Sequence, residues 1–215
     1  MHIPTLEQEH VINLWCSFLL GRSDDSMFLL KGYAGTGKTS LVGALVRTMK
    51  MLKQRVVLLA PTGRAAKVMG GYADTPAGTI HRHIYRQKTF GEEKFTAAPN
   101  LKENTLYIVD EASMIADYSD EGSLFGSGSL LDDLFEYVHQ GQRCRIMFVG
   151  DSAQLPPVGH ELSPALDPQR MAVYGSVCYN TLDEVVRQEE ESGILFNATM
   201  VRCMIENRIY ETPLL

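Results

Sequence analysis

Apolar positions follow two periods along the chain. Short apolar runs typical of buried strands occupy residues 27–31, 55–60, 105–110, 144–150 and 177–182. Apolar residues at helical spacing occupy residues 5–20, 40–50, 64–69, 130–139 and 194–207. Strands that alternate with helices predict an α/β fold, with a mainly parallel sheet and helices on both faces.

Two segments follow neither period. Residues 86–104 place Phe90 and Phe95 around a polar stretch that is too hydrophilic for a core, which predicts a small projecting hairpin. These two rings either pack on each other or contact nucleic-acid bases. Residues 117–129 are rich in Gly, Ser and Asp and predict a mobile acidic loop without chemistry of its own. The chain therefore divides into one domain, residues 1–85 and 105–215, and an insert, residues 86–104.

Composition and charge exclude several classes of protein. The 215 residues are 45% hydrophobic, as in a globular protein, and 20 Lys and Arg stand against 26 Asp and Glu. The resulting charge of −6 argues against binding nucleic acid through a bulk positive field, but it leaves room for a narrow groove with a few cations. The four cysteines lack metal-ligand spacing and predict reduced thiols in a cytoplasmic protein. No segment approaches the roughly 18 apolar residues of a membrane span.

Residues 32–39 read Gly-Tyr-Ala-Gly-Thr-Gly-Lys-Thr and fit the phosphate-binding pattern G-x-x-x-x-G-K-[ST]. A predicted strand precedes this loop and a predicted helix follows it, so backbone N–H groups and the helix dipole form an anion site. Lys38 is predicted to reach the β- and γ-phosphates of a nucleotide, and the Thr39 hydroxyl to bind Mg²⁺. The other predicted nucleotide-binding residues of this segment are Gly32, Ala34, Gly35, Thr36, Gly37 and Ser40.

Polar residues at three further strand ends complete a candidate hydrolytic site. Asp110 is predicted to hold Mg²⁺ through its water shell, and Glu111 to orient or deprotonate the attacking water. Gln154 either senses a γ-phosphate through its amide or belongs to a rigid loop. Arg187 either reaches the γ-phosphate in the transition state or forms an exposed salt bridge.

Other polar residues have two interpretations each. Gln8 stands three residues after a threonine, which is the spacing of a capping box. The alternative is a contact of the Gln8 amide with an adenine edge, and the spacing alone favours the cap. Pro61, Thr62, Arg64 and Lys67 follow a strand end, where they either touch a phosphate backbone or form an ordinary turn and a solvated helix face. His81 has no companion at metal spacing and is either a surface histidine or a stacking or phosphate contact.

Taken together, these segments resemble the motifs of the first RecA-like domain of superfamily 1 DNA helicases, and most closely the RecD-like and Dda-like branch, superfamily 1B. In motif order they are residues 32–39, 60–66, 78–81, 109–114, 150–159 and 187–188. The Leu-Pro-Pro-Val-Gly tail of the fifth segment is the most branch-specific part. The resemblance implies a P-loop NTPase fold of RecA-like type, with residues 86–104 in the place of the family's small 1B hairpin.

The resemblance also implies roles for single residues. Gln8 would contact adenine, and the resemblance favours this interpretation over helix capping without excluding the cap. The residues implied in Mg-ATP hydrolysis are Lys38, Thr39, Asp110, Glu111, Gln154 and Arg187, the last as an arginine finger. Single-stranded DNA would run past Thr62 and His81, and the neighbouring candidates for DNA contact are Pro61, Arg64 and Phe95. Family members move 5′ to 3′ along DNA.

Family members also have a second RecA-like domain, which supplies another arginine to the ATP site. About thirty residues follow Arg187, too few to hold that domain. Because loss of an arginine finger costs on the order of 10³-fold in turnover, we expect this chain to bind Mg-nucleotide, to hydrolyse it slowly and not to unwind DNA alone. A nucleotide-gated binding scaffold without useful turnover is the alternative. A small-molecule P-loop kinase is a distant third, since nothing resembles its lid or acceptor site.

Overall fold

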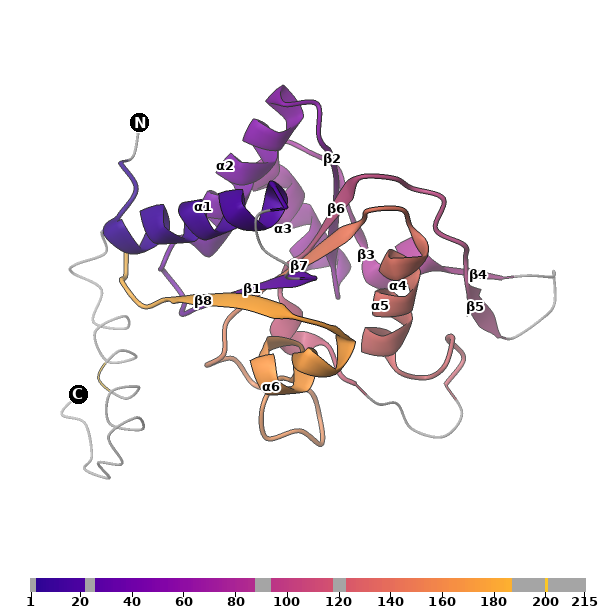
Figure 1. Cartoon of the computed structure of the whole chain (residues 1–215). Helices are drawn as coiled ribbons and strands as arrows, with labels where there is room; N and C mark the ends of the chain where they lie inside the picture. Colours follow the sequence, from indigo (N-terminus) through magenta and orange to yellow (C-terminus); the bar gives the residue numbers. More distant parts are fainter. Residues whose placement is uncertain (1–2, 22–25, 88–93, 118–122, 187–199, 201–215) are drawn as a thin grey trace.

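A six-stranded sheet forms the centre of the molecule (Figure 1). The computed structural model describes residues 3–21, 26–87, 94–117, 123–186 and 200. The strand order is β3-β2-β6-β7-β1-β8, and all neighbouring strands run parallel. The strands are β1 (Met27–Gly32), β2 (Arg55–Ala60), β3 (Ala77–Thr79), β6 (Thr105–Val109), β7 (Arg145–Gly150) and β8 (Val177–Leu182). The predicted parallel α/β sheet is confirmed.

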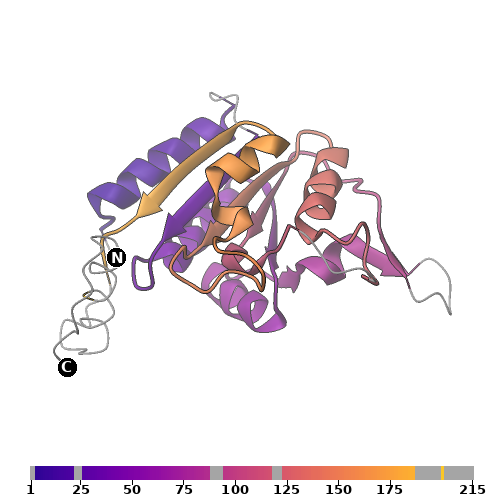
Figure 2. The same ribbon diagram turned by 90° about the horizontal axis from the view of Figure 1, so that it is seen from below.

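Helices cover both faces of this sheet (Figures 1 and 2). One face carries α1 (Leu6–Leu19), α2 (Lys38–Met51) and α3 (Gly63–Ala73). The other carries α4 (Ile80–Ile84), α5 (Leu130–Gln140) and α6 (Pro168–Met171), with the short 3₁₀ turns η1 (Ala112–Met114), η2 (Pro164–Leu166) and η3 (Ala172–Tyr174). The predicted helix at residues 194–207 lies outside the described residues, apart from residue 200.

Each face has its own hydrophobic core because successive strand side chains point to opposite sides. In β1, Phe28 packs under α1, with ring centroids 6.0 Å from Trp15 and 5.8 Å from Phe18. Its neighbours Met27 and Leu29 belong to the opposite core, under α5 and the short helices. All five side chains are at most 2% exposed, so the sheet is held from both sides and its strand ends keep fixed relative positions.

The strand order brings separate loops to one edge of the sheet. β1 lies between β7 and β8, and β7 separates it from β6. Since all these strands are parallel, their carboxyl ends meet at the same edge, where open α/β sheets bind ligands. The loops that follow β1, β6, β7 and β8 are therefore neighbours there.

A separate two-stranded antiparallel sheet, β4 (Tyr85–Gln87) and β5 (Phe95–Ala97), projects from the domain (Figures 1 and 2). It lies in the range for which the sequence predicts a hairpin and begins one residue earlier. The N–H of Phe95 donates to the carbonyl of Leu124, and the N–H of Gly126 donates to the carbonyl of Phe95, both at 2.8 Å. The prediction of a mobile loop is therefore wrong for residues 124–126, because backbone hydrogen bonds fix them against β5, while the absence of chemistry in this segment stays a prediction.

Candidate functional site

The phosphate loop joins the end of β1 to the start of α2. Gly35 and Gly37 have φ values of +87° and +82°, which glycine adopts without a Cβ clash. Gly37 is the residue that caps α2, and it has no side chain to cover the first N–H groups of that helix. The predicted nucleotide-binding residues therefore surround a helix N-terminus suited to an anion: Gly32, Ala34, Gly35, Thr36, Gly37, Lys38, Thr39 and Ser40.

Lys38 folds back over the loop. Its Nζ donates to the carbonyl of Gly32 at 2.6 Å and to the carbonyl of Tyr33 at 2.7 Å. These two bonds hold the ammonium group beside the helix N-terminus. Phosphate oxygens are stronger partners for an ammonium than neutral carbonyls, so the side chain is positioned for exchange onto a phosphate.

Asp110 follows β6 and is buried, with 8% of its surface exposed. Burial raises the pKa of Asp110 to about 6, against the opposing effects of a hydrogen bond from the Glu111 N–H and of the Lys38 charge. That hydrogen bond, from the Glu111 N–H to Asp110 Oδ1, measures 3.0 Å. Asp110 with the Thr39 hydroxyl supplies the hard oxygen donors that Mg²⁺ takes beside phosphates, and a cation there would favour the charged form of this buried carboxylate. These residues therefore fit Mg²⁺.

Gln8 touches the phosphate loop from α1. Its amide oxygen accepts from the N–H of Thr5, and its N–H donates to Thr5 Oγ1, both at 3.3 Å, so the capping box is present. Its Nε2 donates to the carbonyl of Thr36 in the loop at 3.3 Å. The amide thus joins the start of α1 to the loop, and the adenine contact stays a prediction.

The segment after β8 also packs on the phosphate loop. Glu7 Oε2 accepts from the N–H groups of Asp183 and Glu184 at 2.9 and 3.0 Å, and the N–H of Val186 donates to the carbonyl of Gly35 at 3.0 Å. Sequence reasoning missed Glu7, since an acid in a first helical turn signals only a favourable helix start. Arg187, the predicted arginine finger, lies just outside the described residues.

Gln154 is linked to the loop that follows β6. The Ser113 hydroxyl donates to Gln154 Oε1 at 2.8 Å, and the Ser163 hydroxyl donates to the carbonyl of Ser113 at 3.1 Å. The loops after β6 and β7 are therefore connected through a serine, beside the strand end that carries Asp110. Ser113 falls in the segment predicted to bind metal and water, yet its contact with Gln154 spans 41 positions and has no local signal.

Three candidates for DNA contact follow the end of β2, where Ala60 pairs with Thr79 at the end of β3. Thr62 caps α3 by accepting from the Ala65 N–H at 3.2 Å, so its hydroxyl has a structural role. Pro61 precedes it and is half-buried, while Arg64 is exposed on α3. The structure keeps these residues on one edge, apart from the pocket that contains the other two candidates.

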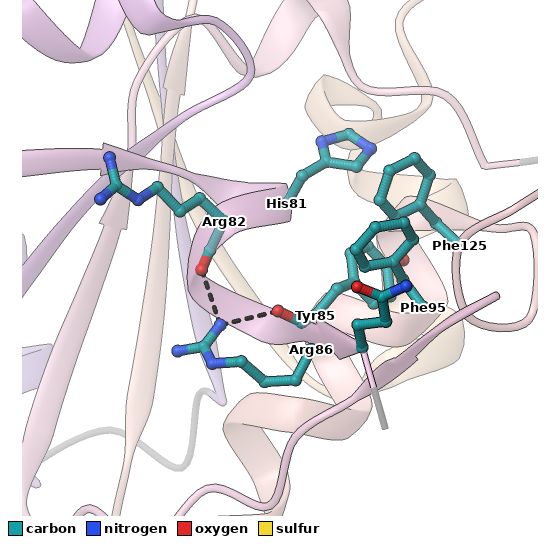
Figure 3. A pocket seen from close by; sticks show the side chains of 7 residues that line it. His81, Arg82, Tyr85, Arg86, Phe95 and Phe125 are labelled. Atoms are coloured by element: carbon teal, nitrogen blue, oxygen red, sulfur yellow. Dashed lines mark hydrogen bonds between the residues drawn. The ribbon is translucent and has the colours of Figure 1, made fainter. Parts of the chain in front are cut away.

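That pocket lies at the base of the hairpin and has a volume of about 470 Å³ (Figure 3). Its walls are His81, Arg82, Tyr85, Arg86, Gln87, Phe95 and Phe125. Phe95 and Phe125 are stacked with centroids 4.9 Å apart, and His81 meets Phe125 edge-on at 5.1 Å. Burial lowers the pKa of His81, so its ring is neutral at physiological pH. The aromatic faces suit an unstacked base, while the guanidinium groups of Arg82 and Arg86 extend away from these rings and that of Arg86 donates to the carbonyls of Arg82 and Tyr85 (Figure 3).

Phe125 is the residue of this pocket that sequence reasoning missed. It lies in the segment expected to be a mobile loop, where a single phenylalanine among Gly, Ser and Asp was the available signal. The segment is fixed by Asp133, which is 4% exposed and accepts from the Tyr85 hydroxyl and from the Ser127 N–H. Burial and the Asp133 hydrogen bond raise the pKa of Tyr85, so this hydroxyl stays a donor.

Across the described ranges, no helix is long and apolar enough to cross a bilayer. The fold and the phosphate loop define a P-loop nucleotide-binding domain of RecA-like α/β type. A family model described as "AAA domain" matches residues 17–201, and the chain belongs to that family. The resemblance to the first RecA-like domain of RecD-like superfamily 1 helicases is confirmed for this domain.

Two curated relatives are longer proteins. The chain is 35% identical over 133 residues to the ATP-dependent RecD2 DNA helicase of Deinococcus radiodurans, which covers 61% of this chain and 16% of that protein. It is 30% identical over 166 residues to the uncharacterized protein MJ1519 of Methanocaldococcus jannaschii, which covers 71% of this chain and 13% of that protein. The chain thus spans less than a fifth of either relative.

A solved structure shares the fold. The crystal structure of the Pif1 helicase from Candida albicans superposes with a TM-score of 0.59 and 22% sequence identity, over 94% of this chain and 44% of the helicase. At this identity the likeness concerns the fold alone, and it agrees with a RecA-like domain.

Proposed function

We propose that the chain is the nucleotide-binding motor domain of an ATP-dependent DNA helicase that moves 5′ to 3′. The observation that carries the proposal is that Lys38, bonded to the carbonyls of Gly32 and Tyr33 in the phosphate loop, stands at the same sheet edge as the buried acid Asp110. A ligand that brings both phosphates and Mg²⁺ satisfies both groups at once. The relative named as a RecD2 DNA helicase supports DNA as the substrate.

In this proposal each residue has one task in the hydrolysis of ATP. Lys38 would neutralise charge on the β- and γ-phosphates. Thr39 and, through the water shell of the ion, Asp110 would hold Mg²⁺, which would supply further positive charge to the phosphates. Glu111 orients or deprotonates the attacking water. Gln154 senses the γ-phosphate from the next loop, held there by the Ser113 hydroxyl.

Further groups complete the proposed motor. Gln8 contacts the adenine, and Arg187 is the arginine finger of this domain. A second RecA-like domain supplies another arginine to the ATP site, as in the family that the sequence resembles. Without that domain, slow ATP turnover and no unwinding are expected of the 215-residue chain.

Single-stranded DNA is proposed to run along the edge of Pro61, Thr62 and Arg64 toward the pocket of His81 and Phe95. Cations beside aromatic faces are the combination that binds single strands with little sequence preference. The rings of this pocket supply the stacking faces, while the Arg86 guanidinium donates to the carbonyls of Arg82 and Tyr85 and the whole chain carries −6 (Figure 3). DNA contact therefore depends on a local surface and not on the net charge.

The test measures ATP turnover and Mg-ADP binding with and without a single-stranded oligonucleotide. Lys38→Ala should abolish nucleotide binding, and Glu111→Gln should keep binding but remove turnover. Stimulation of wild-type turnover by DNA would support the motor. If Glu111→Gln leaves turnover unchanged, Glu111 is not the base and the scaffold alternative is favoured. Robust unwinding by the purified chain would contradict the need for a second domain.

A further inference from the structure

A second groove lies at the edge of the sheet opposite to the phosphate loop. Its volume is about 700 Å³, and its walls come from the starts of β2, β6 and β7 and from the ends of α1 and α2. Because the strands are parallel, their amino ends lie away from the nucleotide edge. The described residues that line this groove include none of those assigned to ATP or DNA above.

Aliphatic side chains form one wall of this groove. Leu20 follows α1 and Leu52 follows α2, and they are 67% and 68% exposed. Met49 lies among the lining residues with 8% exposure. Two large aliphatic side chains in one concave site, each with most of its surface open, offer apolar area to a partner.

Cations surround the aliphatic wall. Lys53, Arg55 and Arg143 line the groove and are exposed, and no salt bridge among the described residues involves them. Arg145 also lines it, but its guanidinium donates to the carbonyl of Phe18 and lies 5.3 Å from that ring, so the fold already uses it. The lining contains one carboxylate, Glu103. This positive cluster contrasts with a chain whose net charge is −6.

The turns that carry these cations are bound to one another. The Gln54 side chain donates to the carbonyl of Asn104, and the N–H of Asn104 donates to the carbonyl of Gln142 at 2.8 Å. Lys53 and Arg143 stand beside these contacts with φ values of +56° and +52°. The groove is therefore preformed, which lowers the ordering cost of binding.

We propose that this groove docks an acidic segment of a partner protein that carries aliphatic side chains. Carboxylates would pair with Lys53, Arg55 and Arg143, and aliphatic groups would cover Leu20 and Leu52. The described lining contains no aromatic side chain on which a base could stack, unlike the pocket at the hairpin. That difference favours a peptide over a nucleic acid.

The test titrates the full chain with a short fluorescent peptide of glutamate and leucine and follows anisotropy. The double variant Lys53→Glu/Arg143→Glu should bind it about tenfold more weakly, since two attractions become repulsions. The matched control Lys67→Glu/Lys94→Glu changes the same charge at exposed positions outside the groove and should bind as wild type does. Unchanged thermal unfolding and Mg-ADP binding report an intact fold.

Wild-type protein alone provides a second measurement. Peptide affinity should fall as salt rises, and a peptide with serine in place of leucine should bind less tightly. Absence of binding at about 1 mM peptide overturns the proposal, because a dissociation constant above this concentration is too weak for a specific peptide-binding site. Equal weakening in both charge variants also overturns it. The proposal is also overturned if the double variant Lys53→Glu/Arg143→Glu loses binding of an oligothymidylate but keeps binding of the peptide.

Discussion

Replacing Asp110 with asparagine is expected to stabilise the nucleotide-free protein at neutral pH. Asp110 is 8% exposed, and burial raises its pKa from 3.8 to about 6. Asparagine has nearly the same shape and keeps an oxygen that can accept the 3.0 Å hydrogen bond from the Glu111 N–H. The substitution therefore removes the buried charge and little else.

The size of this effect follows from the two pKa values. The folded state binds the Asp110 proton more tightly than the unfolded chain does. The contribution of this proton to the free energy of unfolding is therefore fully present below pH 3.8 and is lost as the pH rises from 3.8 through 6. Each pKa unit corresponds to about 1.4 kcal/mol. At pH 7.5 the ionised group therefore lowers the free energy of unfolding by about 3 kcal/mol, and at pH 5 by roughly half of that.

Urea unfolding of wild type and Asp110→Asn at pH 5 and pH 7.5, with metal chelated, measures this difference. The advantage of the variant should grow by 1 to 2 kcal/mol, roughly, between the two pH values. Because the change of Asp to Asn has its own constant effect on packing, the pH dependence is the decisive quantity. Mg-ADP should then stabilise wild type more than the variant, since the Asp110 carboxylate is proposed to hold the ion through its water shell.

A constant difference between the two proteins across this pH range would refute the reasoning, because it would mean that Asp110 titrates alike in the folded and unfolded states. A larger stabilisation of Asp110→Asn than of wild type by Mg-ADP would refute the metal role. The two outcomes are independent and separate the electrostatic argument from the functional one.

Two further substitutions test the DNA pocket and the link between the loops. Phe125→Ala removes the ring stacked on Phe95 and should weaken binding of oligothymidylate about tenfold, since a stacked base contributes ~1–3 kcal/mol. The affinity for Mg-ADP should not change. If the anisotropy titration of the variant matches that of wild type, the pocket is excluded from the DNA path. Ser113→Ala removes the 2.8 Å hydrogen bond to Gln154 and should reduce DNA-stimulated turnover several-fold in a coupled ATPase assay. Nucleotide binding should not change. Loss of Mg-ADP binding would instead point to misfolding of the loop.

The secondary structure was predictable where a local pattern carries it. The apolar runs of the core strands end within a residue or two of the predicted bounds, because burial on both faces demands continuous apolar sequence. The capping box at Gln8 was predictable because it joins residues only three positions apart. The segment at residues 123–129 was not, because its order comes from Asp133 and β5 and not from its own composition.

Contacts between distant segments needed the fold. Glu7 meets the segment after β8 across 176 positions, and Ser113 meets Gln154 across 41. Phe125 reaches His81 because α4 and the hairpin lie side by side. None of these pairs has a periodicity or a spacing that marks it, so no pattern in the sequence could single out Glu7, Ser113 or Phe125.

The sequence by itself determined the phosphate loop, since residues 32–39 bend a single stretch of backbone around an anion and need only their own glycines and the helix that follows. It also determined that the strands are parallel, because helices separate them. Only the tertiary structure decided that β1 lies between β7 and β8, with Asp110 one strand farther away. Strand order depends on how two apolar faces are buried together, which is a property of the whole chain and not of any segment.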